Sequence, residues 1–150
     1  LQDCGGIRRL KFDAAGKTLL ACGMKEPSGG FAVGPPLGIV LDWETGKVRK
    51  ELQYGDKSQG FLHDAVFHSE GYVIGTSGAM PNTGHVWFWN PEDAEPFFIG
   101  KKMPNGRALS LRADGKQLAF LSCISANGNG RPKDKPYLDG TAKILLMELE

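Results

Sequence analysis

The chain has 150 residues, of which 41% are hydrophobic, and its formal net charge at pH 7 is +1. This length is typical of one domain with a sizeable core, and the nearly balanced charge provides no overall field that would attract nucleic acid or an acidic membrane. No apolar run approaches the roughly 18 residues that a membrane-spanning helix needs. We therefore expect neither a nucleic acid nor a membrane as a partner.

Three units of similar layout follow one another along the chain. In each unit an apolar anchor residue precedes a glycine by four positions, and a second apolar run follows the glycine. The anchor and its glycine are Phe12 and Gly16 in the first unit, Phe67 and Gly71 in the second, and Leu111 and Gly115 in the third. Glycine at this place suits the left-handed backbone conformation that closes a hairpin turn. Such self-similarity is typical of propeller blades and other β-arrays.

Each unit is predicted to be an antiparallel meander. The expected strands are 7–12, 17–22, 38–43 and 48–52 in the first unit, 62–67, 72–77, 85–89 and 97–99 in the second, and 107–111, 116–121 and 143–149 in the third. No segment has a convincing helical period, so we expect an all-β fold. Leu10 and Phe12 are predicted to point inward, and the apolar run at 144–147 predicts a strand that is buried on both faces.

The units resemble the blades of the WD-repeat β-propeller family over nearly the whole chain. The matching residues are the turn endings Gly16-Lys17, Glu70-Gly71 and Asp114-Gly115-Lys116, and the third-strand endings at 41–47 and 86–90. Two endings depart from the pattern, because Trp43 follows Asp42 rather than preceding it, and Met147-Glu148 occupies this place in the third unit. The family has a buried network of Asp, His, Ser/Thr and Trp side chains, and Thr76 and Trp89 match two of its places.

The resemblance implies a partial β-propeller of about three four-stranded antiparallel blades, the last of which lacks its outer strand. The blades are expected at approximately 1–55, 56–103 and 104–150. Propellers have about 4–8 blades, and the chain starts at Leu1 rather than Met. We therefore interpret it as part of a larger propeller whose remaining blades are its partners, and a ring closed by oligomerisation is the alternative. A cytoplasmic location is favoured, and a periplasmic or secreted one stays open.

The connections between the second and third strands differ most from unit to unit. They span 23–37, 78–84 and 122–142, and in propellers they emerge on the same face as the connections between units, here 53–60 and 100–105. Unequal loops on a repeated scaffold are where such proteins usually bind. This face is therefore expected to contact a protein or peptide partner.

The third of these loops contains the candidate partner-binding residues. Arg131, Lys133, Lys135 and Tyr137 are predicted to contact an acidic partner. A solvated insertion without a partner is the alternative. A cation held by acidic and amide side chains of this loop is the other alternative, although the loop does not match the EF-hand pattern.

The remaining chemically distinctive residues are interpreted as structural. His63 and Asp64 suggest a general base, but neighbours along a strand point to opposite faces. We therefore expect His63 and His68 to be structural or surface residues. Trp87 and Trp89 share a strand face and are expected to fill the space between blades, although paired aromatic side chains also stack ligands.

No catalytic residue, cofactor or metal site is predicted. His85 is expected to be a packing or edge residue beside the tryptophans. Cys4, Cys22 and Cys123 form neither a zinc motif, a haem motif nor a disulfide framework. Cys22 and Cys123 end apolar runs and are predicted to be buried, reduced thiols.

Two functions from different classes follow. The first is a non-catalytic binding or scaffold module that presents its loop face to a protein or peptide. The alternative is part of a propeller enzyme, a hydrolase or quinone-dependent dehydrogenase, whose site lies largely in other blades. Such an enzyme needs acids or histidines at matched positions facing the channel. The matched residues here are Arg8, His63 and Arg107, which include no carboxylate. A purely architectural domain beside a catalytic one is a third possibility.

Overall fold

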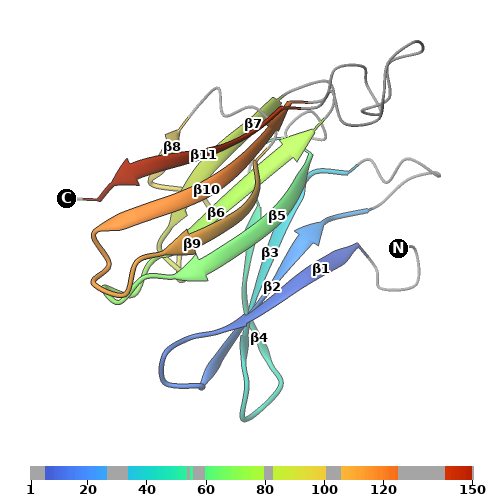
Figure 1. Ribbon diagram of the computed structural model, residues 1–150. Coiled ribbons are helices and arrows are strands. Elements are labelled where there is room, and N and C mark those ends of the chain that lie inside the picture. The colour runs from blue at the N-terminus through green and yellow to red at the C-terminus, as the bar shows by residue number, and fades with distance from the viewer. Residues whose placement is uncertain are drawn as a thin grey trace.

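The computed structural model describes residues 6–26, 34–53, 55, 60–79, 83–100, 106–124 and 141–149. These residues form strands joined by turns, and none of them is helical. The strands make three antiparallel sheets, each built from consecutive strands of the chain (Figure 1). The predicted all-β fold and the three meanders are therefore confirmed. Within the described residues, no helix is present that is long and apolar enough to cross a membrane.

Each sheet corresponds to one sequence unit. The first sheet contains β1 (Ile7–Phe12), β2 (Thr18–Met24), β3 (Pro36–Asp42) and β4 (Val48–Gln53). The middle sheet contains β5 (Phe61–Phe67), β6 (Val73–Ala79), β7 (Thr83–Trp89) and β8 (Phe98–Gly100). The third sheet contains β9 (Gly106–Leu111), β10 (Gln117–Ile124) and β11 (Thr141–Glu148). In each sheet the neighbouring strands are also neighbours in sequence.

The first hairpin turn is built in the same way in all three sheets. Gly16, Gly71 and Gly115 have φ angles of +69°, +92° and +75°. Each donates its backbone N–H to the carbonyl three residues earlier, at 2.9–3.1 Å. The positive φ explains the glycine, because a side chain disfavours this conformation. The turn prediction is confirmed in each unit.

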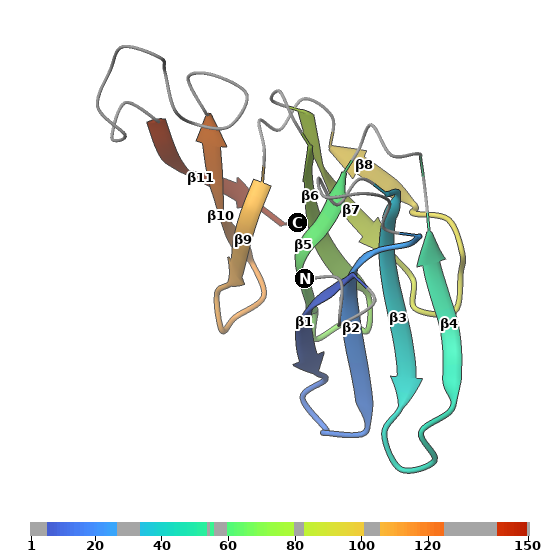
Figure 2. The same ribbon diagram turned by 90° about the vertical axis from the view of Figure 1, so that its right-hand side faces the viewer.

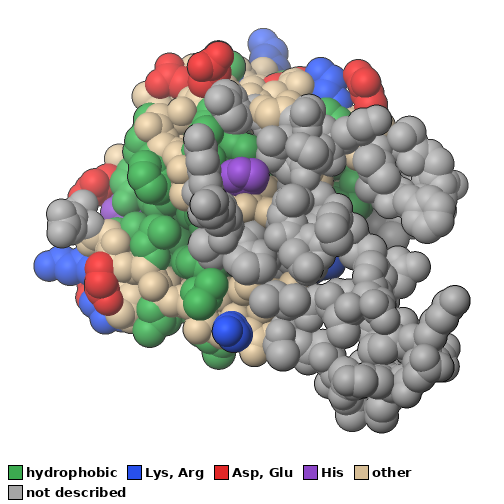
Figure 3. All heavy atoms as spheres, turned by 90° about the horizontal axis from the view of Figure 1, so that it is seen from above, with side chains coloured by type: hydrophobic (Ala, Val, Ile, Leu, Met, Phe, Trp, Pro, Cys, Tyr) green, Lys and Arg blue, Asp and Glu red, His purple; other side chains and the backbone are tan. Residues whose placement is uncertain are grey.

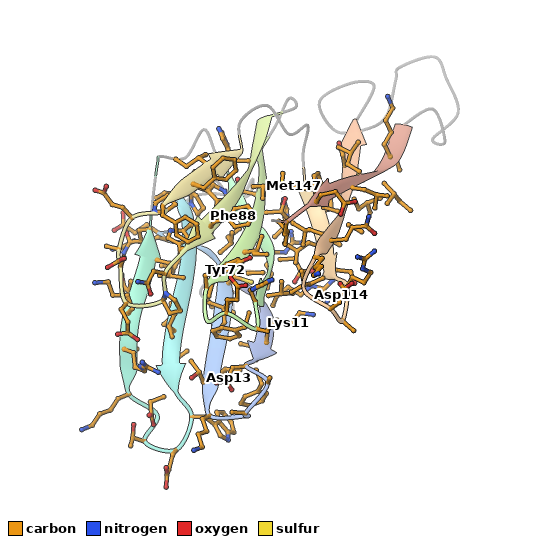
Figure 4. All side chains as sticks on the ribbon, turned by 90° about the vertical axis from the view of Figure 1, so that its left-hand side faces the viewer. Lys11, Asp13, Tyr72, Phe88, Asp114 and Met147 are labelled. Atoms are coloured by element: carbon orange, nitrogen blue, oxygen red, sulfur yellow. The ribbon has the colours of Figure 1, made fainter. Side chains whose placement is uncertain are left out.

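The sheets pack face to face, with the middle sheet between the other two (Figure 2). One buried cluster joins the first sheet to the middle sheet and includes Leu20, Val40 and Trp87. A second cluster joins the middle sheet to the third and includes Phe88 and Leu118. Figure 4 shows Phe88 in this second region with Met147, which packs against the same cluster from β11.

We call the contact between the first and middle sheets the first junction, and the contact between the middle and third sheets the second junction. Equivalent faces of the sheets meet at both. At the first junction, the face of the middle sheet that contains Ala65 and Trp87 meets the first sheet. At the second, the face of the third sheet that contains Leu109 and Leu145 meets the middle sheet. Ala65 and Leu109 stand at the same position in their units, two residues before the anchor. The middle and third sheets therefore offer the same face to the sheet before them.

The two outer faces of this stack are apolar and exposed. On the first sheet, Leu10 is 60% exposed and Phe12 is 50% exposed. On β11, Ile144 is 74% exposed and Leu146 is 63% exposed. Hydrophobic side chains also form a band across the visible surface when the molecule is seen from above (Figure 3).

Two burial predictions were therefore wrong. Leu10 and Phe12 do not point into a core, because no described sheet covers their face. The apolar run of β11 is covered on one face only, by the contacts of Leu145 and Met147 with the middle sheet. Side chains at the equivalent positions of the middle sheet are buried or partly buried, because that sheet has neighbours on both sides.

Candidate functional site

The matched residues Arg8, His63 and Arg107 converge on one point. Each lies four positions before the anchor of its unit, near the start of β1, β5 and β9. Arg8 Nη1 is 3.4 Å from Nδ1 of His63, and Arg107 Nη1 is 3.2 Å from Nε2 of the same ring. One residue from each sheet thus meets at the edge where these strands begin, which we call the loop edge.

His63 is held in its neutral form. Its side chain is buried, and burial is the largest influence that lowers its pKa, to about 3. The charges of Arg107 and Arg8 lower it further, and a hydrogen bond with the backbone of Gly78 opposes the shift. A neutral imidazole carries one N–H donor and one acceptor nitrogen. His63 is therefore a weak base that stays unprotonated near neutral pH.

Asp64 does not orient His63. Its carboxylate accepts the backbone N–H of Ala65 at 3.1 Å and that of Leu109 at 3.2 Å. The second bond crosses from the middle sheet to the third. The prediction that His63 and Asp64 act separately is confirmed, and Asp64 is a structural link between sheets.

His68 links the same two sheets at the opposite edge, which we call the turn edge. Its Nε2 is 2.9 Å from the carbonyl oxygen of Gly115, and its Nδ1 accepts the backbone N–H of Glu70 at 3.2 Å. Together these bonds place the ring proton on Nε2. The ring stacks on Tyr72, with centroids 4.2 Å apart. His68 is structural, as predicted.

A hollow of about 770 Å³ also opens at the turn edge. Its lining includes charged side chains from all three units, namely Lys11, Asp13, Arg49, Glu92 and Arg112. Most of them already have partners. Asp13 accepts backbone N–H groups of its own turn, which lowers its pKa, Arg49 pairs with Glu92, and Arg112 bonds Asp114. Figure 4 shows Asp13 and Asp114 projecting from their turns. These bonds favour a structural role for the charges of the hollow.

The tryptophans of β7 fill the first junction, as predicted. Trp87 and Trp89 are each 1% exposed and stack with ring centroids 5.6 Å apart. His85 packs beside Trp87 at 5.0 Å. Trp87 Nε1 donates to Ser77 Oγ at 2.8 Å.

The family network is not formed by Thr76 and Trp89. Thr76 Oγ1 and Trp89 Nε1 are buried without hydrogen-bond partners among the described residues. Thr76 pairs with Val86 across the sheet, whereas Trp89 pairs with Val73. Alternation places the two side chains on opposite faces, so they cannot share a bond.

The thiols differ in burial. Cys22 is fully buried, and burial, with the charge of Asp64 as the next cause, raises its pKa to about 12. Cys123 is only partly buried, so the prediction of a buried thiol holds for Cys22 alone. Both are free thiols. Cys4 lies outside the described residues.

Arg131, Lys133, Lys135 and Tyr137 lie outside the described residues, so their predicted partner contact stays a prediction. In the part of the chain that the structure describes, no group of three or more His, Cys, Asp or Glu side chains is placed to hold a metal ion. The convergence of Arg8 and Arg107 on His63 was not predicted. Its signal was their shared offset from the anchors. No protein-family model matches the chain, and no curated protein matches it.

Proposed function

We propose that the chain is part of a WD-like β-propeller and acts as a non-catalytic binding module that presents its loop edge to a protein or peptide. The observation that carries the proposal is the repeated junction between sheets. The middle and third sheets pack the same face against the sheet before them, and β5 contacts both β1 and β9. Successive antiparallel sheets that pack through the same face support this interpretation, because propeller blades are sheets repeated around an axis.

The loop edge is favoured as the binding surface because it holds the variable part of each unit. β2, β6 and β10 run in the same general direction, upward in Figure 1, and end at this edge. The connections that follow them differ in length from unit to unit. The turn edge, in contrast, is built from the same glycine turn three times. Variation on a fixed scaffold is typical of binding surfaces.

The test compares substitutions at the two edges. In the first variant, Arg131, Lys133 and Lys135 are changed to Ala. In the control, Lys17, Lys47 and Lys116, exposed lysines of the turn edge, are changed to Ala. Each protein is immobilised and exposed to a lysate of its own source, and proteins retained by the unchanged chain are identified and titrated as purified partners. We expect the loop-edge variant to bind the partner at least tenfold more weakly. Removal of the three cations leaves acidic groups of the partner unpaired in the interface, which is costly.

The control variant should keep the affinity of the unchanged chain. Equal binding by all three proteins would argue against the loop edge. A loss of affinity confined to the control variant would show that the partner binds the turn edge and would contradict the proposal.

A further inference from the structure

We propose that Arg8, His63 and Arg107 form a binding site for a small oxyanion, in which a phosphate or carboxylate group bridges the two guanidinium groups beside the imidazole. This site is independent of the proposed protein partner. It is formed by residues from three sheets and exists only because the units pack side by side.

The first argument is charge. Two guanidinium groups approach the same neutral ring from its two nitrogens, at 3.4 Å and 3.2 Å. Among the described residues, no Asp or Glu forms an ion pair with Arg8 or Arg107. The neighbouring carboxylate, that of Asp64, is committed to backbone N–H groups. Two like charges without a counterion produce a local positive potential that an anion lowers.

The second argument is hydrogen bonding. Both arginines present only donors, and a neutral imidazole has one acceptor nitrogen. The ring can therefore satisfy Arg8 or Arg107, but not both. A bridging oxyanion supplies the missing acceptors, because its oxygens accept from both guanidinium groups at once. Arginine favours this planar, bidentate recognition of carboxylate and phosphate.

The third argument concerns how the two arginines are held. The guanidinium carbon of Arg8 lies 4.9 Å from the centre of the Phe61 ring, which offsets part of its charge and fixes its position. For Arg107, burial lowers the pKa and the charge of Arg8 acts in the same direction, with Cys123 opposing. An anion beside Arg107 would offset this cost of its charge.

The three residues differ in exposure. Arg8 and Arg107 are exposed residues, whereas His63 is 5% exposed. The neutral imidazole does not repel an anion, because it carries no charge. The site thus combines two cationic side chains with a buried, neutral imidazole, which suits a ligand that carries a single phosphate or carboxylate.

The test uses the histidine rings as reporters. The chain has three histidines, so their ring signals are resolved by NMR, and His68 and His85 serve as internal controls. The protein is titrated at pH 7 and constant ionic strength with inorganic phosphate in one arm and acetate in the other. We expect a saturable shift of the His63 ring signals, with the other two rings unmoved. The arm that saturates at the lower concentration identifies the oxyanion.

Variants show whether the arginines are responsible. Arg107→Gln and Arg8→Gln should each weaken the saturable shift by about tenfold or more, because each removes one charge-assisted contact. Arg112→Gln, at the turn edge, is the matched control and should leave it unchanged. Backbone spectra of each variant confirm folding.

Three outcomes would overturn the site. The first is the absence of a saturable His63 shift in both arms. The second is an equal shift of all three rings. The third is an oxyanion affinity equal to that of the unchanged protein in both folded arginine variants.

Discussion

At the scale of single residues, Gly106 lets the third sheet approach the middle sheet closely, because glycine has no side chain. A Cβ added to Gly106 would lie 2.0 Å from Oγ1 of Thr76, which is fully buried. Gly106→Ala is therefore expected to lower the free energy of unfolding by about 1–3 kcal/mol through overpacking. Urea-induced unfolding measures this loss. Gly106→Ala should recover stability when combined with Thr76→Ala, because the clashing oxygen is removed. Additive losses would contradict the clash.

A second prediction at this scale concerns pH. The folded-state pKa of His63 is about 3, below its ordinary value, while Arg8 and Arg107 face the ring. The unfolded state therefore binds more protons between pH 6.5 and 3, and stability falls as the pH is lowered through this range. From pH 7 to pH 5 the loss attributable to His63 is about 2 kcal/mol. His63→Gln should remove this part of the pH dependence in urea unfolding. Parallel curves for the two proteins would show that His63 is not held neutral.

At the scale of elements, the positions of the strands could be predicted from the sequence. Which face of a sheet is covered by another sheet could not. The turn at Gly16 needs a positive φ wherever it occurs, so its position is local information. Whether Phe12 is buried depends instead on a neighbouring sheet. Phe67, its equivalent, packs against the first junction, whereas Phe12 is half exposed. Strand patterns show which side chains share a face, but not which faces meet.

The candidate site at His63 could likewise be predicted only in part from the sequence. The shared offset of Arg8, His63 and Arg107 from their anchors gave equivalent positions in each unit. Their meeting at one ring depends on how far each sheet is rotated against the next, which no local pattern encodes. The link from His68 to Gly115 was missed for the same reason, because it joins residues of different units.

That link leads to a prediction about the second junction. The imidazole of His68 bonds the Gly115 carbonyl inside the contact between sheets. His68→Ala should lower the free energy of unfolding by about 2 kcal/mol, because a buried acceptor loses its partner. His68→Gln places an amide N–H near the position of Nε2 and should restore part of the loss. Thermal unfolding monitored by circular dichroism compares them. Equal stability of the Ala variant and the unchanged protein would contradict the link.

At the scale of the whole molecule, the stack ends in two apolar faces of complementary kind. The free face of the first sheet, with Leu10 and Phe12, is equivalent to the faces that receive a preceding sheet at both junctions. The free face of the third sheet, with Ile144 and Leu146, is equivalent to those that pack onto a following sheet. The third sheet of one copy can therefore pack onto the first sheet of another copy in the same way as the sheets pack at the two junctions within the chain. Exposed apolar faces of this kind promote association.

Sedimentation velocity of the purified chain over a range of concentrations tests this repeated-junction account most directly. We predict reversible, concentration-dependent association of the unchanged chain. Changing Ile144 and Leu146 to Glu should suppress it. Lys143→Glu, on the opposite face of the same strand, should not. A cooperatively melting monomer with the same sedimentation coefficient at every concentration would contradict the account.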